Sequence, residues 1–221
     1  MRQVLYHDRQ AGTSTFPGWE QQVNEKPSRE AGLGREGILD AAESCLHRFG
    51  PAKTTVEDVA QAAGLSRATV YRQFGNRDAL LLAVAAREAD RVASAAQLFL
   101  RRFDDVGSWL VEGILFCLRE IPNRPLLAQF LTPQELGAAS TMVLTSERML
   151  AIGSEILRPM FEPARAAGLL HEGLELDALI EWILRILISF LAVPGPESRS
   201  EDEVRDLLRT LLLPAVLVDP S

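Results

Sequence analysis

GLSRATVYRQFGNR, which runs from Gly64 to Arg77, is the stretch that decides the fold prediction. Gly64 can adopt the left-handed backbone conformation that a sharp turn needs. Ser66 is a favourable N-cap for a following helix, in which Val70 and Phe74 stand four residues apart on one side. The stretch therefore predicts a turn followed by a short helix with one apolar side.

A second short helix is predicted immediately before this turn. Thr55 is a natural N-cap, and the apolar residues that follow it end at Gly64. Ala60 is small where two helices must cross closely, and Val70 can fill the angle between them. Together these positions predict a helix-turn-helix.

Positive charge gathers on this part of an acidic chain. Residues 59–77 hold three arginines and no acidic residue, although the 221-residue chain has a formal net charge of −7. Residues 92–221 account for the negative charge, with 11 basic and 18 acidic side chains. A local basic face can neutralise DNA phosphates even in an acidic protein, so the two parts of the chain are expected to have different partners.

The residues around the turn match the chemistry of a DNA-binding surface. An arginine can donate two hydrogen bonds to guanine, a threonine methyl can contact thymine, and hydroxyl groups suit phosphate oxygens. Ser66 could instead serve only as an N-cap, and Tyr71 could pack against the preceding helix. Thr69 and Arg72 could be ordinary solvated surface. The predicted DNA-contacting residues are Lys53, Thr55, Ser66, Arg67, Thr69, Tyr71, Arg72, Gln73 and Arg77.

Apolar residues recur at helical spacing along most of the chain, which predicts an all-α fold. Residues 1–34 lack this periodicity and are expected to form a flexible extension. Pro159 and Pro163 should kink or split the helix that contains them, since each removes a backbone donor. The expected helices span 35–49, 55–63, 66–74, 76–100, 108–120, 125–131, 136–144, 146–167, 177–193 and 201–213.

The segment TTVEDVAQAAGLSRATVYRQFGNRDALLLAV, from Thr54 to Val84, resembles the DNA-binding domain of the tetracycline-repressor-like (TetR) family of bacterial regulators. The lead-in REGILDAAESCLHRFG, from Arg35 to Gly50, is similar to the first helix of that family. The resemblance implies a helix-turn-helix DNA-binding domain at 35–80 and a helical effector-binding and dimerisation domain at 81–221. It also implies a homodimer that binds double-stranded operator DNA, most often as a repressor that a small molecule releases.

Two departures from the family pattern lie just after the predicted recognition helix. Gly75 stands where the family often has proline, and Arg77 stands where it often has a lysine that touches phosphate. Positive charge is kept at Arg77, so the departures affect the geometry of the contact.

Two C-terminal helices have the pattern of a dimer interface. Residues 179–193 carry more apolar surface than one core can cover, because their three polar residues fall on one narrow stripe. Such helices from two subunits can form a four-helix interface, although a helix buried deep within one subunit would show the same pattern. The predicted interface residues are Ile183, Leu187, Leu191, Leu208 and Leu212.

Large apolar side chains in the second domain could line a pocket for an apolar effector or simply fill the core. The candidates are Trp109, Phe116, Phe130, Met142, Met149 and Trp182. Control by a protein partner, or the absence of any ligand, remains an alternative to this pocket.

Enzyme, metal and cofactor sites are not predicted. The three histidines lie near no credible nucleophile or carboxylate pair, so an enzyme is only a remote alternative. Cys45 and Cys117 lie in helical patterns without metal-ligand spacing and are expected to be buried free thiols. No stretch reaches the length of a membrane span and the N-terminus lacks a signal-peptide core, so the protein is expected in the cytoplasm.

Overall fold

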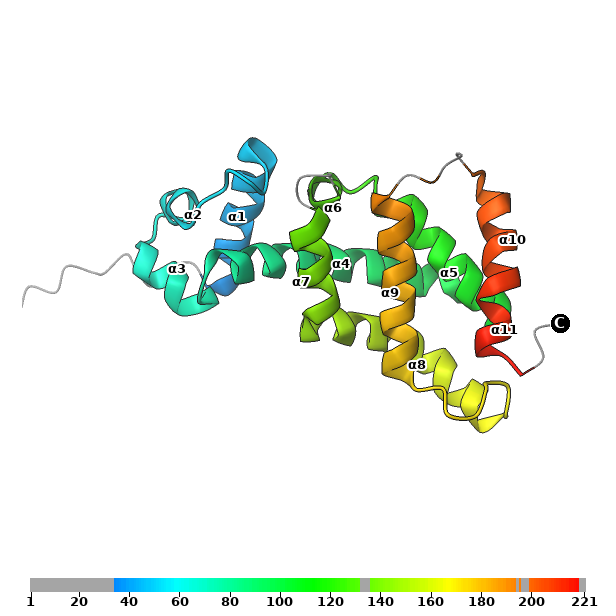
Figure 1. Ribbon diagram of the computed structural model, residues 1–221. Coiled ribbons are helices and arrows are strands. Elements are labelled where there is room, and N and C mark those ends of the chain that lie inside the picture. Colours follow the sequence, from blue (N-terminus) through cyan, green and yellow to red (C-terminus); the bar gives the residue numbers. More distant parts are fainter. Residues whose placement is uncertain (1–33, 132–135, 194, 196–198, 219–221) are drawn as a thin grey trace, which may run out of the picture. The chain divides into compact units, whose positions relative to one another are not determined.

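The computed structural model describes residues 34–131, 136–193, 195 and 199–218. All the regular structure in these residues is helical, apart from one isolated antiparallel bridge between Leu170 and Leu217 (Figure 1). The all-α prediction is therefore confirmed. The predicted extension lies, except for Gly34, outside the described residues.

Helices α1 (Arg35–Phe49), α2 (Val56–Ala63) and α3 (Arg67–Phe74) form the helix-turn-helix region, and they begin and end close to the predicted limits. The Thr55 hydroxyl accepts a hydrogen bond from the Asp58 amide, and the Asp58 carboxylate accepts one from the Thr55 amide, which makes a full capping box. Ser66 caps α3 by accepting from the Thr69 amide.

The turn between α2 and α3 depends on glycine for its backbone conformation. Gly64 has φ +67°, a left-handed conformation that side chains with a Cβ rarely adopt, and no atom lies within 4 Å of where its Cβ would stand. The Leu65 amide donates to the Ala60 carbonyl at 2.9 Å, which closes the end of α2. Glycine is therefore required here by its backbone conformation, since a Cβ at this position would meet no other atom.

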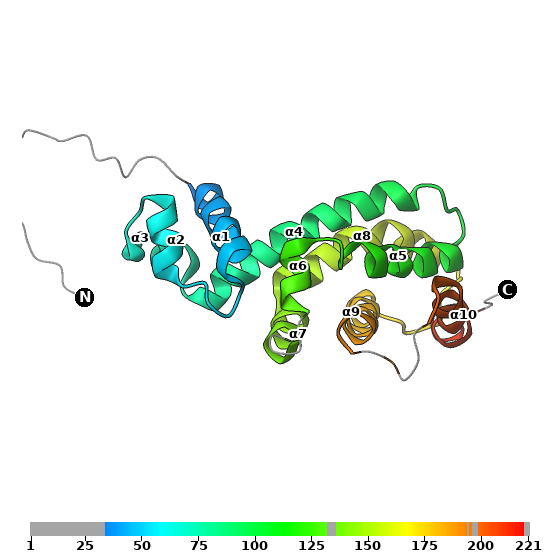
Figure 2. The same cartoon turned by 90° about the horizontal axis from the view of Figure 1, so that it is seen from above.

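Helix α4 (Arg77–Leu100) runs from the helix-turn-helix region into the C-terminal helices (Figures 1 and 2). Its first half packs in one core with α1, α2 and α3 through residues such as Leu80 and Val84. Its second half packs beside α5 (Val106–Glu120) through residues such as Leu100. The predicted domain boundary at 80 and 81 thus falls inside one continuous helix.

The short helix α6 (Pro125–Phe130) also contributes to the first core. Leu126 and Phe130 are buried in the cluster that contains Ile38 and Leu39 of α1. A segment about 50 residues beyond α3 in the sequence therefore completes the core of the helix-turn-helix region. The sequence pattern did not indicate this contact.

The remaining helices form the C-terminal core around Phe161, Leu179 and Ile180, each at most 2% exposed. Both α9 and α10 pack against α5, and α8 packs between α4 and α9 (Figure 2). The expected helix over 201–213 instead ends at Leu211, and a separate turn of helix follows it. These helices are α7 (Leu136–Thr145), α8 (Glu147–Ala166), α9 (Leu176–Ala192), α10 (Glu201–Leu211) and α11 (Leu213–Val216).

Helix α8 continues through its two prolines, Pro159 and Pro163, so it is not split there. Pro159 removes the amide that would bond to the Glu155 carbonyl four residues earlier. The side-chain amide of Gln97, from α4, donates to that carbonyl at 3.1 Å instead. A neighbouring helix thus satisfies the acceptor that the proline leaves free.

Candidate nucleic-acid interface and ligand cavity

Helix α3 presents a polar surface and buries its apolar side. Val70 and Phe74 are buried in the first core, whereas Tyr71, Arg72 and Gln73 are exposed. This orientation follows from the four-residue spacing of the two buried side chains. The predicted base-reading and phosphate-contacting residues of the last turn therefore face solvent.

The two arginines of α3 have different surroundings. Arg67 forms an ion pair with Glu57 of α2, and its guanidinium lies 5.9 Å from the centre of the Tyr71 ring. A hydrogen bond with Tyr71 is the largest cause that raises the pKa of Arg67, so this side chain stays charged. Arg72 and Lys53 are exposed and have no acidic partner within the described part of the chain. A DNA contact by Arg67 would require this side chain to leave Glu57, whereas Arg72 has no such ion pair among the described residues.

Hydroxyl groups at the starts of α2 and α3 are already engaged in capping. The Thr55 hydroxyl donates to the Asp58 carboxylate at 2.6 Å, and the Ser66 and Thr69 hydroxyl oxygens lie 2.9 Å apart. Hydrogen bonds with Thr55, the side-chain one first, lower the pKa of Asp58. Thr55 and Ser66 therefore both serve as N-caps, and their contacts with DNA stay a prediction.

Arg77 has a second role that the sequence did not indicate. Its Nε donates to the Thr54 carbonyl at 2.7 Å, and its Nη2 donates to the Pro51 carbonyl. The side chain is 37% exposed, and it ties the first residue of α4 to the loop before α2. A phosphate contact by this guanidinium is left only to its remaining N–H groups.

A charged cluster joins α1 to α4 and was also missed in the sequence. Arg87 of α4 lies 2.6 Å from Glu43, 2.8 Å from Asp40 and 3.1 Å from Glu36, measured between ion-pair atoms. The three acids stand four and three residues apart, so they share one face of α1. The spacing of these acids on one face of α1 is the feature of the sequence that could have predicted a basic partner on another helix.

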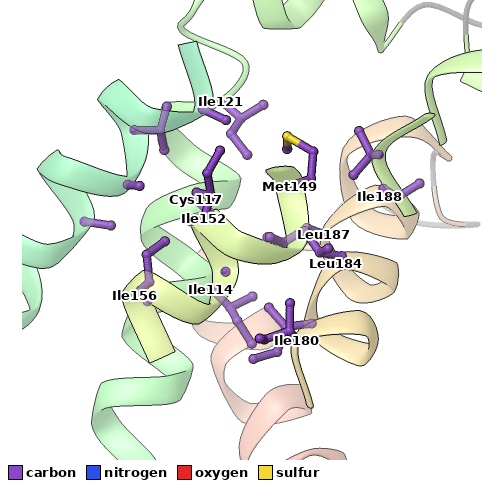
Figure 3. A pocket seen from close by; sticks show the side chains of 18 of the residues that line it. Ile114, Cys117, Ile121, Met149, Ile152, Ile156, Ile180, Leu184, Leu187 and Ile188 are labelled. Atoms are coloured by element: carbon purple, nitrogen blue, oxygen red, sulfur yellow. The ribbon is translucent and has the colours of Figure 1, made fainter. Parts of the chain in front are cut away.

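A cavity of about 200 Å³ lies among the C-terminal helices (Figure 3). Figure 3 shows Ile114 and Cys117 of α5, Met149 and Ile152 of α8, and Leu184 of α9 converging on it. Helix α4 contributes mainly alanines, so the space exists partly because the side chains on that wall are short. These alanines are Ala85, Ala89, Ala93 and Ala96.

The candidate ligand-binding residues divide into three groups. Trp109, Phe130 and Met149 line the cavity. Phe116 is buried in the core beside α4, and Trp182 is 54% exposed on α9, so neither lines the cavity. The side chain of Met142 lies outside the described residues.

The structure places the residues predicted at the dimer interface but does not test that role. Ile183, Leu187 and Leu191 line the cavity and are partly exposed, whereas Leu208 and Leu212 are buried in the C-terminal core at 4% and 2% exposure. The interface role of these five residues stays a prediction.

Both cysteines are free, as expected. Burial is the main cause that raises the pKa of Cys45, and it raises the pKa of Cys117 to about 12. Cys117 lines the cavity as a neutral thiol at physiological pH, so it adds no charge there.

The described residues contain neither a candidate metal site nor a candidate membrane-spanning helix. No group of three or more His, Cys, Asp or Glu side chains there is placed to hold a metal ion. None of the helices in the same residues combines the length and the apolar character needed to cross a membrane.

Comparison with known proteins agrees with this geometry. Residues 38–84, which cover α1 to the start of α4, match the family model of bacterial regulatory proteins of the tetR family. An uncharacterized HTH-type transcriptional regulator of Mycobacterium tuberculosis is 28% identical over 189 residues, which is 86% of this chain and 88% of that protein. The HTH-type transcriptional regulator AlkX of the same species is 29% identical over 183 residues, covering 81% of this chain and 83% of the relative.

A solved structure extends the likeness to both parts of the fold. The TetR family repressor AlkX from Dietzia sp. strain DQ12-45-1b matches with a TM-score of 0.59 and 27% identity, over 82% of this chain and 94% of that one. The helix-turn-helix with its exposed polar face, the family match over those same helices and the shared C-terminal helices lead to one conclusion. Residues 38–84 match the TetR family, and the comparisons together support a TetR-family DNA-binding transcriptional regulator.

Proposed function

We propose that this regulator is a homodimeric repressor that leaves its operator when a small apolar molecule enters the cavity. The observation that carries the proposal is Phe130, which belongs both to the core of the helix-turn-helix region and to the cavity wall. A molecule that displaces this ring must disturb the packing of α1 and α4, because the interior is close-packed.

DNA binding is assigned to the exposed face of α3 and its flanks. Arg72 and Gln73 supply donors for base edges or phosphates, and Lys53 supplies charge beside them. Arg67 would exchange Glu57 for a base or phosphate on binding. Thr55 and Ser66 would position these side chains through their helix caps, and Thr69, Tyr71 and Arg77 would contact the DNA beside them.

Helix α4 offers a second connection between cavity and DNA-binding face. Ala85 lies both in the first core and in the cavity wall, and Arg87, two residues later, holds α1 through its acidic cluster. Asp90 of the same helix pairs with Arg148 of α8 at 2.6 Å. Any shift of α8 around a ligand would therefore pull on α4, whose first residue anchors the loop before α2.

The dimer is proposed to form through the outward stripe of α9, defined as Ala178, Trp182, Arg185, Ser189 and Val193, which are all exposed. Trp182 and Val193 are 54% and 58% exposed, and Leu211 of α10 is 67% exposed. Exposed aromatic and aliphatic side chains of this kind favour a protein partner over water. A two-fold dimer would place its two α3 helices in successive major grooves, about 34–36 Å apart.

The relatives support the apolar character of the ligand. The Dietzia repressor AlkX is described as implicated in the biodegradation of n-alkanes, and this chain shares 27% of its residues. The cavity here is lined by apolar side chains, which suits a molecule of similar character. Coupling between ligand and operator is expected at about 1–3 kcal/mol, or a 5- to 150-fold change in affinity.

The test starts from the operator, selected from genomic fragments that the purified protein retains. Arg72→Ala should weaken binding by about 1–3 kcal/mol if the side chain reads a base. If it contacts only phosphate, the slope of log K against log salt should flatten by about one. Arg101→Ala is the matched control, because Arg101 is exposed at the far end of α4. Unchanged affinity and slope for Arg72→Ala would remove α3 from the interface.

Control by a protein partner, or regulation without any ligand, is the second candidate. The almost entirely apolar lining of the cavity among the described residues favours a small molecule over both. Linkage gives the discriminating measurement. A true inducer must bind more weakly to the operator complex than to the free protein, by the same factor by which the inducer weakens operator binding. A compound that binds both forms equally is not the inducer.

A further inference from the structure

The described part of the cavity wall has few groups that could satisfy a polar group of a ligand. The described lining residues are alanine, valine, leucine, isoleucine, glycine, phenylalanine, methionine, tryptophan and cysteine, and none of these is charged. Trp109 carries the only side-chain N–H among them, and Cys117 the only S–H. The backbone amides of the lining helices are largely used within the helices themselves. A ligand oxygen in the cavity would therefore find few partners or none.

This lack of partners discriminates between classes of apolar ligand. A neutral polar group that is buried without a hydrogen bond loses affinity by a factor of about 5 to 150, and a buried carboxylate without a partner loses far more. A hydrocarbon has no polar group and therefore loses no affinity in this way. Cys117 does not change the comparison, because burial keeps its thiol neutral.

The volume sets the size of the molecule. A dry, engineered apolar cavity of about 150 Å³ binds benzene. At about 200 Å³, the cavity here has room for a hydrocarbon somewhat larger than benzene.

Two glycines in the wall have different functions. A Cβ at Gly153 of α8 would stand 2.6 Å from Cγ2 of Ile180, so glycine is needed there for α8 to approach α9. A Cβ at Gly113 of α5 would stand 3.4 Å from the Leu100 side chain, which is an ordinary contact. The fold therefore has room for a methyl group at Gly113, and that methyl would occupy cavity space.

Taking the ligand-controlled function above as given, we propose that the cavity takes a neutral hydrocarbon without a hydrogen-bonding group. Gly113 sets the upper size limit of that hydrocarbon. Fatty acids and alcohols with the same carbon skeleton should bind more weakly when their head groups lie among the described lining residues, because these residues offer few hydrogen-bond partners. Gly113 is a specificity-determining residue for the ligand and has no part in DNA binding.

The experiment measures direct binding to the full-length, DNA-free protein by calorimetry. The probes are cyclohexane, cyclohexanol and cyclohexanecarboxylate, which share one ring and differ in the polar group. Cyclohexane should bind, cyclohexanol should bind at least about fivefold more weakly, and the carboxylate should not bind measurably. Equal binding of the carboxylate and cyclohexane, or no binding of cyclohexane, would overturn the proposal.

Gly113→Ala tests the size limit with a series of alkylcyclohexanes of increasing length. The variant should fold at least as well as the parent, since alanine favours a helix more than glycine does. Its affinity for the largest ring that the parent binds should fall at least about fivefold, while cyclohexane still binds. Unchanged affinity for that largest ring would remove Gly113 from the proposal.

Operator release is measured separately on the same compounds. If cyclohexane binds but does not release the operator, the ligand-controlled function fails while the chemistry of the cavity stands. If a carboxylate releases the operator and competes with cyclohexane, the proposed ligand class fails while ligand control stands.

Discussion

Helices α3 and α9 both carry residues that the sequence assigned to partners, and the structure treats the two assignments differently. On α3, the residues assigned to DNA in the last turn are exposed and available. On α9, Ile183, Leu187 and Leu191, which the sequence assigned to a second subunit, line the cavity of their own chain, and Trp182 on another side of the helix is exposed. An apolar pattern typical of a partner surface can therefore also line a cavity within the chain.

The difference comes from how much of each helix is determined locally. In α3 the cap, the turn glycine and two buried side chains fix which face is inward, and all of these lie within about a dozen residues. Helix α9 is apolar around most of its circumference, so its own sequence does not say which apolar face meets which neighbour. Only packing against α5, α7 and α8 decides it.

The largest expected effect tests the outward stripe of α9. Trp182→Glu should weaken the dimer by at least about 2 kcal/mol, or roughly 30-fold, because a buried interface tryptophan is lost and a charge is placed against the partner. Sedimentation at micromolar concentration measures the change. Leu98→Glu is the control, since Leu98 of α4 is also exposed, at 68%, and lies outside the stripe. A dimer that survives Trp182→Glu unchanged would place the interface elsewhere.

The helix-turn-helix could be predicted from the sequence because each signal acts over a few residues. Thr55, Ser66 and Asn76 cap the helices that follow them, as expected. The contribution of Phe130 to the same core could not be predicted, because it depends on how a segment more than 50 residues away folds back. The cavity escaped prediction for a similar reason, since its alanines on α4 are ordinary helix residues until the opposite walls are known.

The next effect concerns Arg77, which the sequence treated as a phosphate contact. If its bonds to the Thr54 and Pro51 carbonyls matter, Arg77→Lys should cost about 1–2 kcal/mol of unfolding free energy, because one ammonium cannot replace two N–H groups of a planar guanidinium. Operator affinity should fall as well, although the charge is kept. Urea unfolding and operator titration measure the two effects.

Arg72→Lys provides the control for this substitution, because Arg72 has no acidic partner among the described residues and lies on the exposed face of α3. It should leave the free energy of unfolding unchanged. If Arg77→Lys is as stable as the parent, the hydrogen bonds of Arg77 to the two carbonyls do not stabilise the fold, and only the phosphate contact predicted from the sequence is left as its role.

The smallest expected effect concerns the capping boxes at the starts of α2 and α10. Asp58 closes a capping box with Thr55 at the start of α2, and Glu203 closes one with Ser200 at the start of α10. Hydrogen bonds with the cap residues lower the pKa of both carboxyls, chiefly from the Thr55 side chain to Asp58 and from the Ser200 backbone to Glu203. Each folded pKa thus lies below the ordinary value of 3.8 for Asp58 and 4.5 for Glu203.

The stability from each box is therefore fully present above the ordinary pKa and is lost as the pH falls through the lowered folded value. Asp58→Asn and Glu203→Gln should each be less stable than the parent at pH 7, and the gap should close as the pH falls below about 4. Urea unfolding at several pH values measures this, and a gap that persists at pH 2 would mean that the carboxylate charge is not its source.

Only Asp58→Asn should also weaken operator binding, because α2 positions α3, whereas α10 packs on α5 far along the chain. Equal loss of operator affinity in Glu203→Gln would show that the C-terminal helices control the position of α3 as strongly as its own caps do.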